Sequence, residues 1–122
     1  MSHIRTATCK IKNPDQGTMN ATMQVLAKQY GGVVTTSIKD YYGNNIEVIA
    51  GLSSLNYGLI VKDGALAVTG DGFGKRVKVD MFREVFEKTY IQIAMMTVMK
   101  SLGYQVNANE SDLGVLIQGI KA

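Results

Sequence analysis

Cysteine, histidine and proline each occur once in this chain, and tryptophan is absent. Because Cys9 has no second cysteine to pair with, an internal disulfide is excluded. We therefore expect the protein to reside in the reducing cytoplasm. Metal sites use clusters of His, Cys, Asp or Glu at ligand spacing, and His3 has only Cys9 near it in sequence. The sequence therefore predicts neither a metal site nor a bound cofactor.

Long hydrophobic runs are missing as well. The longest, IAMMTVM at 93–99, is interrupted by Thr97 and is far shorter than the roughly 20 residues that span a bilayer. The N-terminal MSHIRTATCK lacks the apolar segment of a signal peptide, so we expect none. These absences predict a cytoplasmic protein without a membrane partner.

Neither sign of charge dominates the composition. Thirteen Lys and Arg residues oppose ten Asp and Glu residues, which gives a net charge of +3. An excess this small barely favours a nucleic-acid partner. With 122 residues and 46% hydrophobic content, the chain is long enough to bury a core, and we expect one globular domain, residues 1–122.

Two segments have the spacing of amphipathic helices. The first has Asn13 as its predicted N-cap and Pro14 at its first helical position, and Gly31-Gly32 ends it. The second is predicted over residues 81–102, with Asp80 as its N-cap.

The other periodic segments are typical of strands bounded by turn residues. Asp63-Gly64 gives the strongest hairpin signal of the chain, and Gly43-Asn44 marks a second turn. The expected strands are 4–12, 33–38, 46–52, 57–61, 65–69, 104–108 and 114–120. The sequence thus predicts an α+β fold, a mostly antiparallel sheet with two helices in the order β-α-β-β-β-β-α-β-β.

The segment GDGFGKRVK, residues 70–78, invites comparison with phosphate-binding loops. A P-loop follows G-x-x-x-x-G-K-[ST], but here three residues separate the first glycine from the Gly-Lys pair, and Arg76 stands where a hydroxyl is needed. The dinucleotide fingerprint G-x-G-x-x-G fails too. We interpret the segment as a solvated exit from a hairpin. The alternative is a site for an anion or an acidic partner, built from Lys75, Arg76 and Lys78.

No catalytic constellation is evident in the sequence. Nucleophilic catalysis requires a Ser or Cys beside a base and an orienting carboxylate, and GLSSLN at 51–56 lacks the G-x-S-x-G pattern. Asp40 and Glu47 would flank one hairpin, where acidic residues usually serve solubility. The sequence therefore favours a non-enzymatic protein.

Nucleic-acid binding would use exposed aromatic and basic side chains on a sheet. Tyr41, Tyr42 and Tyr57 are the aromatic candidates, with Lys39 and Lys62 nearby. Because no ribonucleoprotein motif accompanies them, we expect these tyrosines to be buried or to cover a sheet edge. The sequence thus argues against nucleic acid as a partner.

The second predicted helix is unusually apolar. One of its sides is expected to carry Phe82, Val85, Phe86, Tyr90, Ile93, Met96 and Leu102. In addition, IQIAMMTVM at 91–99 is apolar nearly all round, which is typical of a helix buried on two sides or shared with another subunit. Met95, Met96 and Met99 either fill gaps in the core or form a helix–helix interface, and the sequence leaves both interpretations open.

Several motifs together resemble an uncharacterised cyanobacterial and plastid family, a domain of unknown function typified by the conserved chloroplast reading frame number thirty-five. The likeness lies in the opening MSHIRT, in YYGN before IEVI, in NYGLIVKDGAL, and in FREVFEKTY followed by GYQV. It covers nearly the whole chain in order. The chain departs from the family in its missing tryptophan and in its glycine loop at 70–74.

The resemblance implies an accessory role without family catalytic residues. In cyanobacteria such a protein would be linked to photosystem assembly. In bacteria and phages its partners would be a small companion protein and an AAA-type ATPase. Combined with the residue patterns, this favours a non-enzymatic module that binds a protein partner or itself as a homo-oligomer. The alternative is a small anionic-ligand or nucleotide-binding domain that uses the 70–78 loop.

Overall fold

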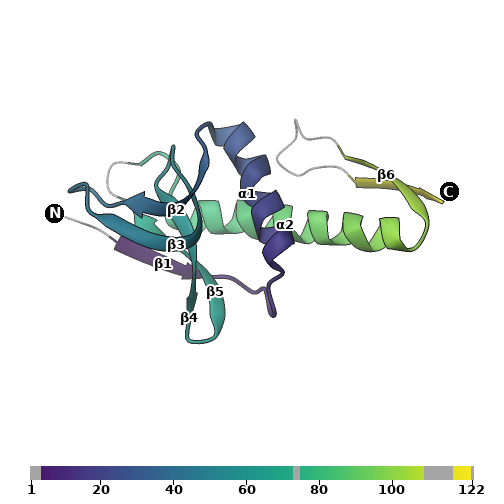
Figure 1. The fold of residues 1–122 in the computed structure, drawn as a ribbon, viewed down its shortest axis with the longest axis horizontal. Coiled ribbons are helices and arrows are strands. Elements are labelled where there is room, and N and C mark those ends of the chain that lie inside the picture. The colour runs from purple at the N-terminus through teal and green to yellow at the C-terminus, as the bar shows by residue number, and fades with distance from the viewer. Residues whose placement is uncertain (1–3, 73–74, 109–116, 122) are drawn as a thin grey trace.

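The computed structural model describes residues 4–72, 75–108 and 117–121, and it confirms the predicted α+β fold and element order (Figure 1). The elements are β1 (Ile4–Thr8), α1 (Gln16–Tyr30), β2 (Val34–Lys39), β3 (Asn45–Leu52), β4 (Tyr57–Lys62), β5 (Ala65–Asp71), α2 (Val79–Ser101), β6 (Tyr104–Ala108) and β7 (Ile117–Lys121).

Five strands form an antiparallel sheet in the order β1-β5-β4-β3-β2, while β6 and β7 form a separate antiparallel pair. Both predicted hairpins of the main sheet are confirmed, because β2 pairs with β3 and β4 pairs with β5. At the β4–β5 turn, Asp63 and Gly64 both have positive φ angles, 53° and 79°. Positive φ at both turn positions matches the right-handed twist of the flanking strands.

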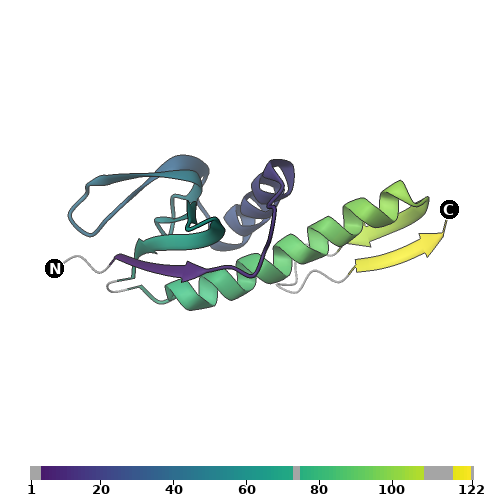
Figure 2. The ribbon, with the colours of Figure 1, turned by 90° about the horizontal axis from the view of Figure 1, so that it is seen from below.

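Both helices pack on one face of this sheet, and the hydrophobic core that the described residues form lies between the layers. Its fully buried members include Met23 and Leu26 from α1, Leu59 from β4, and Phe82 and Phe86 from α2. Only the N-terminal half of α2 covers the sheet. Figures 1 and 2 show the C-terminal half extending beyond the sheet, with β6 and β7 beside it.

The two helix starts differ from their predictions. Asp15, not Asn13, is the N-cap of α1, and its Oδ2 accepts a hydrogen bond of 2.8 Å from the backbone N–H of Thr18. Asn13 has φ 49°, whereas an N-cap residue has an extended backbone. Helix α2 begins at Val79, two residues before the predicted start, so Asp80 lies in its first turn. There its carboxylate still interacts favourably with the helix dipole.

Strand bounds differ mainly at the ends. The strand expected over 4–12 ends at Thr8, and the chain then turns so that the Lys10 N–H donates to Glu87 at 3.0 Å. The strand expected over 65–69 continues to Asp71, so it takes in the first two residues of the glycine segment. Residues 114–116 of the last predicted strand lie outside the described part of the chain.

A bend in the β2–β3 hairpin brings its tip back toward β5. The pairing register shifts between Thr35 and Ser37, which is the signature of a bulge. Beyond it, Val48 packs over the cross-strand pair Gly51 and Gly58, where a Cβ on Gly58 would lie 2.6 Å from Val48 Cγ1. Because Gly51 and Gly58 have no Cβ, Val48 has room to pack over them and the hairpin can bend here.

Candidate functional site

The glycine segment begins inside the sheet rather than in a loop. Gly70 is the cross-strand partner of Tyr57, and the Tyr57 ring lies directly against it. A Cβ at position 70 would lie 2.4 Å from Tyr57 Cδ1, which real side chains do not tolerate. Gly70 is thus required by the packing of a buried tyrosine, and phosphate binding is not needed to explain it.

Lys75 fastens the same segment to Tyr57. Its ammonium lies 4.6 Å from the centroid of the Tyr57 ring and donates a hydrogen bond to the carbonyl oxygen of Leu55. The Tyr57 hydroxyl in turn donates to the carbonyl of Val77 at 2.6 Å. Burial lowers the pKa of Lys75 below its ordinary value, partly offset by Asp71. This lysine is therefore engaged internally.

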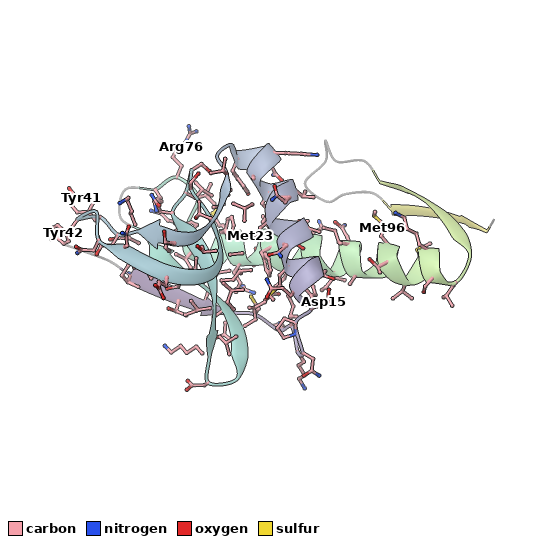
Figure 3. The ribbon with its side chains drawn as sticks, viewed as in Figure 1. Asp15, Met23, Tyr41, Tyr42, Arg76 and Met96 are labelled. Carbon is pink, nitrogen blue, oxygen red and sulfur yellow. The ribbon has the colours of Figure 1, made fainter. Side chains whose placement is uncertain are left out.

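The three cations of the predicted anion site have different surroundings. Lys75 is half-buried, whereas Arg76 and Lys78 are exposed, and Lys78 is the N-cap residue of α2. Figure 3 shows Arg76 pointing outward from the molecule. The inward contacts of Lys75 leave Arg76 and Lys78 as the exposed members of the trio.

The tip of the β2–β3 hairpin presents two tyrosines to solvent. Tyr41 and Tyr42 are 56% and 61% exposed, whereas Tyr57 is completely buried. The expectation that all three would be buried or would cover an edge is thus wrong for Tyr41 and Tyr42. The reason is that both residues lie in the turn between Lys39 of β2 and Asn45 of β3, beyond the last strand pair, where little of the fold covers their rings.

Beside this tip is a hollow of about 190 Å³. It lies where the tip of the β2–β3 hairpin meets the end of β5. At this point the Tyr41 N–H donates a hydrogen bond of 2.9 Å to the Asp71 carboxylate. Its lining combines both charge signs with amide and aromatic groups. The lining residues are Lys39, Asp40, Tyr41, Asn56, Asp71 and Lys75.

A second candidate surface lies on the C-terminal half of α2. Here the exposed hydrophobic side chains recur at intervals of four, three and four residues, so they form one stripe along the helix. We call this set the α2 stripe; it consists of Ile91, Met95, Val98 and Leu102. Each member is more than half exposed, and Leu102 reaches 66%.

The α2 stripe borders an apolar groove of about 340 Å³. The small side chain of Ala94 leaves space between larger neighbours, and the described residues that line the groove are all uncharged. Its lining residues are Tyr90, Ile91, Ala94, Met95, Val98 and Met99. The surface therefore alternates protruding side chains with a depression, as helix-packing surfaces do.

The three methionines predicted as core or interface do not lie together. Met95 belongs to the α2 stripe and is 54% exposed, and Met99 lines the adjoining groove. Met96 points the other way, toward the side of α2 where β6 and β7 lie (Figure 3). The apolar side predicted for this helix was expected to include both Met96 and Leu102, but Leu102 is exposed. At their spacing in the sequence, one face of a helix cannot hold both residues.

Ile91 and Val98 are surface residues that the sequence patterns did not single out. Their 4-3-4 spacing with Met95 and Leu102 is visible in the sequence, but an apolar segment on all sides does not reveal which side remains exposed.

The described residues offer little chemistry of other kinds. Burial raises the pKa of the Cys9 thiol to about 11, with Glu87 adding to the effect, so the reactive thiolate is disfavoured. Within residues 4–72, 75–108 and 117–121, no group of three or more His, Cys, Asp or Glu side chains could hold a metal ion. His3 lies outside these ranges. No helix in the described part of the chain has the length and apolarity needed to cross a membrane.

Comparisons with protein-family models, curated proteins and solved structures gave no match to this chain. The resemblance to the plastid and cyanobacterial family therefore stays a prediction.

Proposed function

We propose that this protein is a non-enzymatic module that associates with a second copy of itself through the C-terminal half of α2. The observation that carries the proposal is the α2 stripe, four large apolar side chains that are each more than half exposed at helical spacing. Single exposed apolar residues are common, but a contiguous row beside an apolar groove is typical of an interaction surface.

The surface is suited to pairing with its own copy. In an antiparallel arrangement about a two-fold axis, Ile91 would face Leu102 of the second copy, and Met95 would face Val98 of the second copy. A two-fold interface requires such self-complementarity, because the same patch occurs on both sides. Ala94 provides the space into which a protruding side chain of the second copy would insert.

The outer face of the same helix supplies a boundary for the interface. One heptad before Ile91 and Met95 are Glu84 and Lys88, and both are exposed. These charges would remain solvated beside a dimer but would be costly to bury. A contact limited to half of one helix is smaller than a standard interface of about 800 Å² per partner, so we expect a weak, micromolar dimer.

Light scattering on the purified full chain tests this proposal. We expect a dimer at micromolar concentration, and a monomer for Met95→Glu/Val98→Glu, whose charges would have to be desolvated. Thr97→Glu is the matched control, because Thr97 is exposed on α2 but is not part of the α2 stripe. Circular dichroism should give the same fold for all three proteins.

A wild-type monomer throughout the micromolar range would contradict the proposal. So would a dimer that persists in folded Met95→Glu/Val98→Glu. If the double variant does not fold, the milder Met95→Gln/Val98→Thr tests the same interface.

Two further expectations accompany the proposal. The family resemblance suggests a small companion protein or an AAA-type ATPase as other occupants of the α2 stripe, and binding of either would compete with self-association. We also infer a cytoplasmic location, because the chain has a single cysteine, which is buried as a free thiol. The anionic-ligand alternative has less support, since Lys75 is engaged with Leu55 and Tyr57.

A further inference from the structure

The tip of the β2–β3 hairpin carries an exposed aromatic pair. The rings of Tyr41 and Tyr42 meet edge to face, with centroids 5.4 Å apart. Figure 3 shows both at the end of the molecule farthest from the C-terminal end of α2. Because this surface is separate from the α2 stripe, a role for it goes beyond the proposed function and is independent of it.

Hydrogen bonds hold the backbone beneath the two rings. The Asp71 carboxylate accepts from the Tyr41 N–H, and the Asp40 carboxylate accepts from the N–H groups of Tyr42 and Asn44 at 2.9 and 2.8 Å. The Lys39 N–H donates to Asn56 Oδ1 at 3.0 Å, which ties the base of the tip to the β3–β4 turn. The aromatic pair is thus preorganised, so a ligand need not order the loop when it binds.

Charged side chains of both signs lie beside the tip. Asp40 and Asp71 direct their carboxylates at backbone N–H groups, and Asp71 is buried. Lys39 and Arg76 are exposed, and Lys39 lines the hollow beside Tyr41 together with Lys75, the chain neighbour of Arg76. Lys39 and Lys75 thus balance the two carboxylates, and the exposed Arg76 adds one positive charge, so the net charge around the hollow is weakly basic.

We propose that the Tyr41–Tyr42 tip binds single-stranded nucleic acid, with unpaired bases stacking on the tyrosines and phosphates contacting Lys39 and Arg76. Base stacking on exposed aromatic rings combined with nearby cations is the general mode of sequence-tolerant single-strand binding. Cations alone would suit an acidic peptide equally well, but two solvent-exposed rings favour a ligand with flat faces to stack. The sequence argued against nucleic acid because its positive excess is small, it has no ribonucleoprotein motif, and the three tyrosines were expected to be covered. Of these three, Tyr41 and Tyr42 are in fact exposed.

Fluorescence anisotropy with a labelled oligothymidine of about 20 nucleotides tests the proposal on the full chain. Tyr41→Leu/Tyr42→Leu should weaken binding at least about tenfold, because leucine cannot stack on a base. Tyr41→Phe/Tyr42→Phe should keep wild-type affinity, because the rings remain. Both variants change exposed positions, and thermal melting checks that they fold.

Charge variants separate local phosphate contacts from general attraction. Lys39→Ala and Arg76→Ala should each weaken binding and reduce the slope of log affinity against log salt by about 1. Lys62→Ala is the matched control, since Lys62 is also exposed but lies at the opposite end of β4 from Tyr57 and the hollow. It should bind as the wild type does.

Three results would each overturn the inference. The first is absence of oligothymidine binding at low salt. The second is equal affinity of the leucine and phenylalanine double variants. The third is a poly-glutamate peptide that binds more tightly than the oligonucleotide and depends on the same residues, which would assign the tip to an acidic protein partner.

Discussion

The two halves of α2 belong to one helix but have different surroundings. The N-terminal half buries Val79, Phe82 and Phe86 against the sheet and α1. Its outer face carries charged residues such as Glu84 and Lys88. The C-terminal half has left the sheet behind, and its outer face carries the α2 stripe instead (Figures 1 and 2).

The two halves of α2 therefore differ in what covers their apolar side chains. In the N-terminal half the core accounts for most of the apolar side chains. Met81 is exposed near the start of the helix, and the solvent side otherwise carries polar residues, as expected for an amphipathic helix. In the C-terminal half the described residues leave Ile91, Met95 and Val98 in solvent, so folding of one chain does not account for them. Association of two chains would.

The largest expected effect is a difference in stability between variants in the two halves of α2. Phe86→Ala should lower the free energy of unfolding by about 3–5 kcal/mol, because it opens a cavity in a close-packed core. Ile91→Ala should change it by less than about 0.5 kcal/mol in the monomer. Urea unfolding at concentrations below the dimer range measures both. Equal losses would mean that the C-terminal half is as well packed as the N-terminal half.

Next in size is the polar anchor of the N-terminal half. Glu87 Oε1 accepts hydrogen bonds from Arg83 at 2.9 Å and from the Lys10 N–H at 3.0 Å, and Glu87 and Arg83 are both largely buried. Glu87→Leu should destabilise the fold by about 1–3 kcal/mol, since it leaves two donors without their acceptor. Glu84→Leu, at an exposed neighbour, is the control for urea unfolding. If the two variants lose the same stability, the anchor has no special role.

Replacing the exposed charges that separate the two halves tests the same difference through self-association. Glu84→Leu/Lys88→Leu would extend the α2 stripe by two positions toward the N-terminus. We expect self-association about tenfold tighter, which corresponds to roughly 1.4 kcal/mol. Sedimentation or light scattering over a dilution series measures the change. A matched Lys28→Leu variant on the exposed part of α1 should leave association unaltered.

The effect that is smallest at mildly alkaline pH is a pH dependence beside the N-terminal half. Burial raises the pKa of Cys9 to about 11, so the folded protein keeps the thiol neutral at a pH where the unfolded chain ionises it. Stability from this group is complete below the unfolded pKa of about 8.5 and is lost as the pH rises toward 11. Thermal melting of wild type and Cys9→Ala from pH 8 upward should show a steeper decline for the wild type. Parallel declines would refute the assignment.

Much of the fold was accessible from local signals. Asp63-Gly64 predicted the β4–β5 hairpin because few residues other than glycine and its small polar neighbours adopt positive φ. Helix ends were harder, since Asn13, Asp15 and Asp80 are all good N-cap residues, and the choice among them depends on where the chain enters the helix. Tyr90 fixes that point for α1, because its hydroxyl accepts from the Asp15 N–H at 2.9 Å.

The candidate surfaces could be predicted from the sequence only in part. The sequence identified Tyr41, Tyr42 and the apolar second helix as unusual, but it assigned the tyrosines to buried or edge positions. Their exposure depends on how the β2–β3 turn lies against the end of β5, which only contacts between distant residues define, such as the hydrogen bond from the Tyr41 N–H to Asp71. The glycine segment needed the same information, because its requirement for Gly70 comes from Tyr57, thirteen positions earlier.

The sequence by itself determined the order of strands and helices, the turns at glycine, and the apolar character of α2, because backbone sterics and residue periodicity act over a few neighbouring positions. The tertiary structure decided which apolar and aromatic residues remain in solvent. That choice is a property of the folded chain: a helix longer than the sheet beneath it, and a hairpin turn that extends beyond the last strand pair, leave exposed what their local patterns would equally allow to be buried.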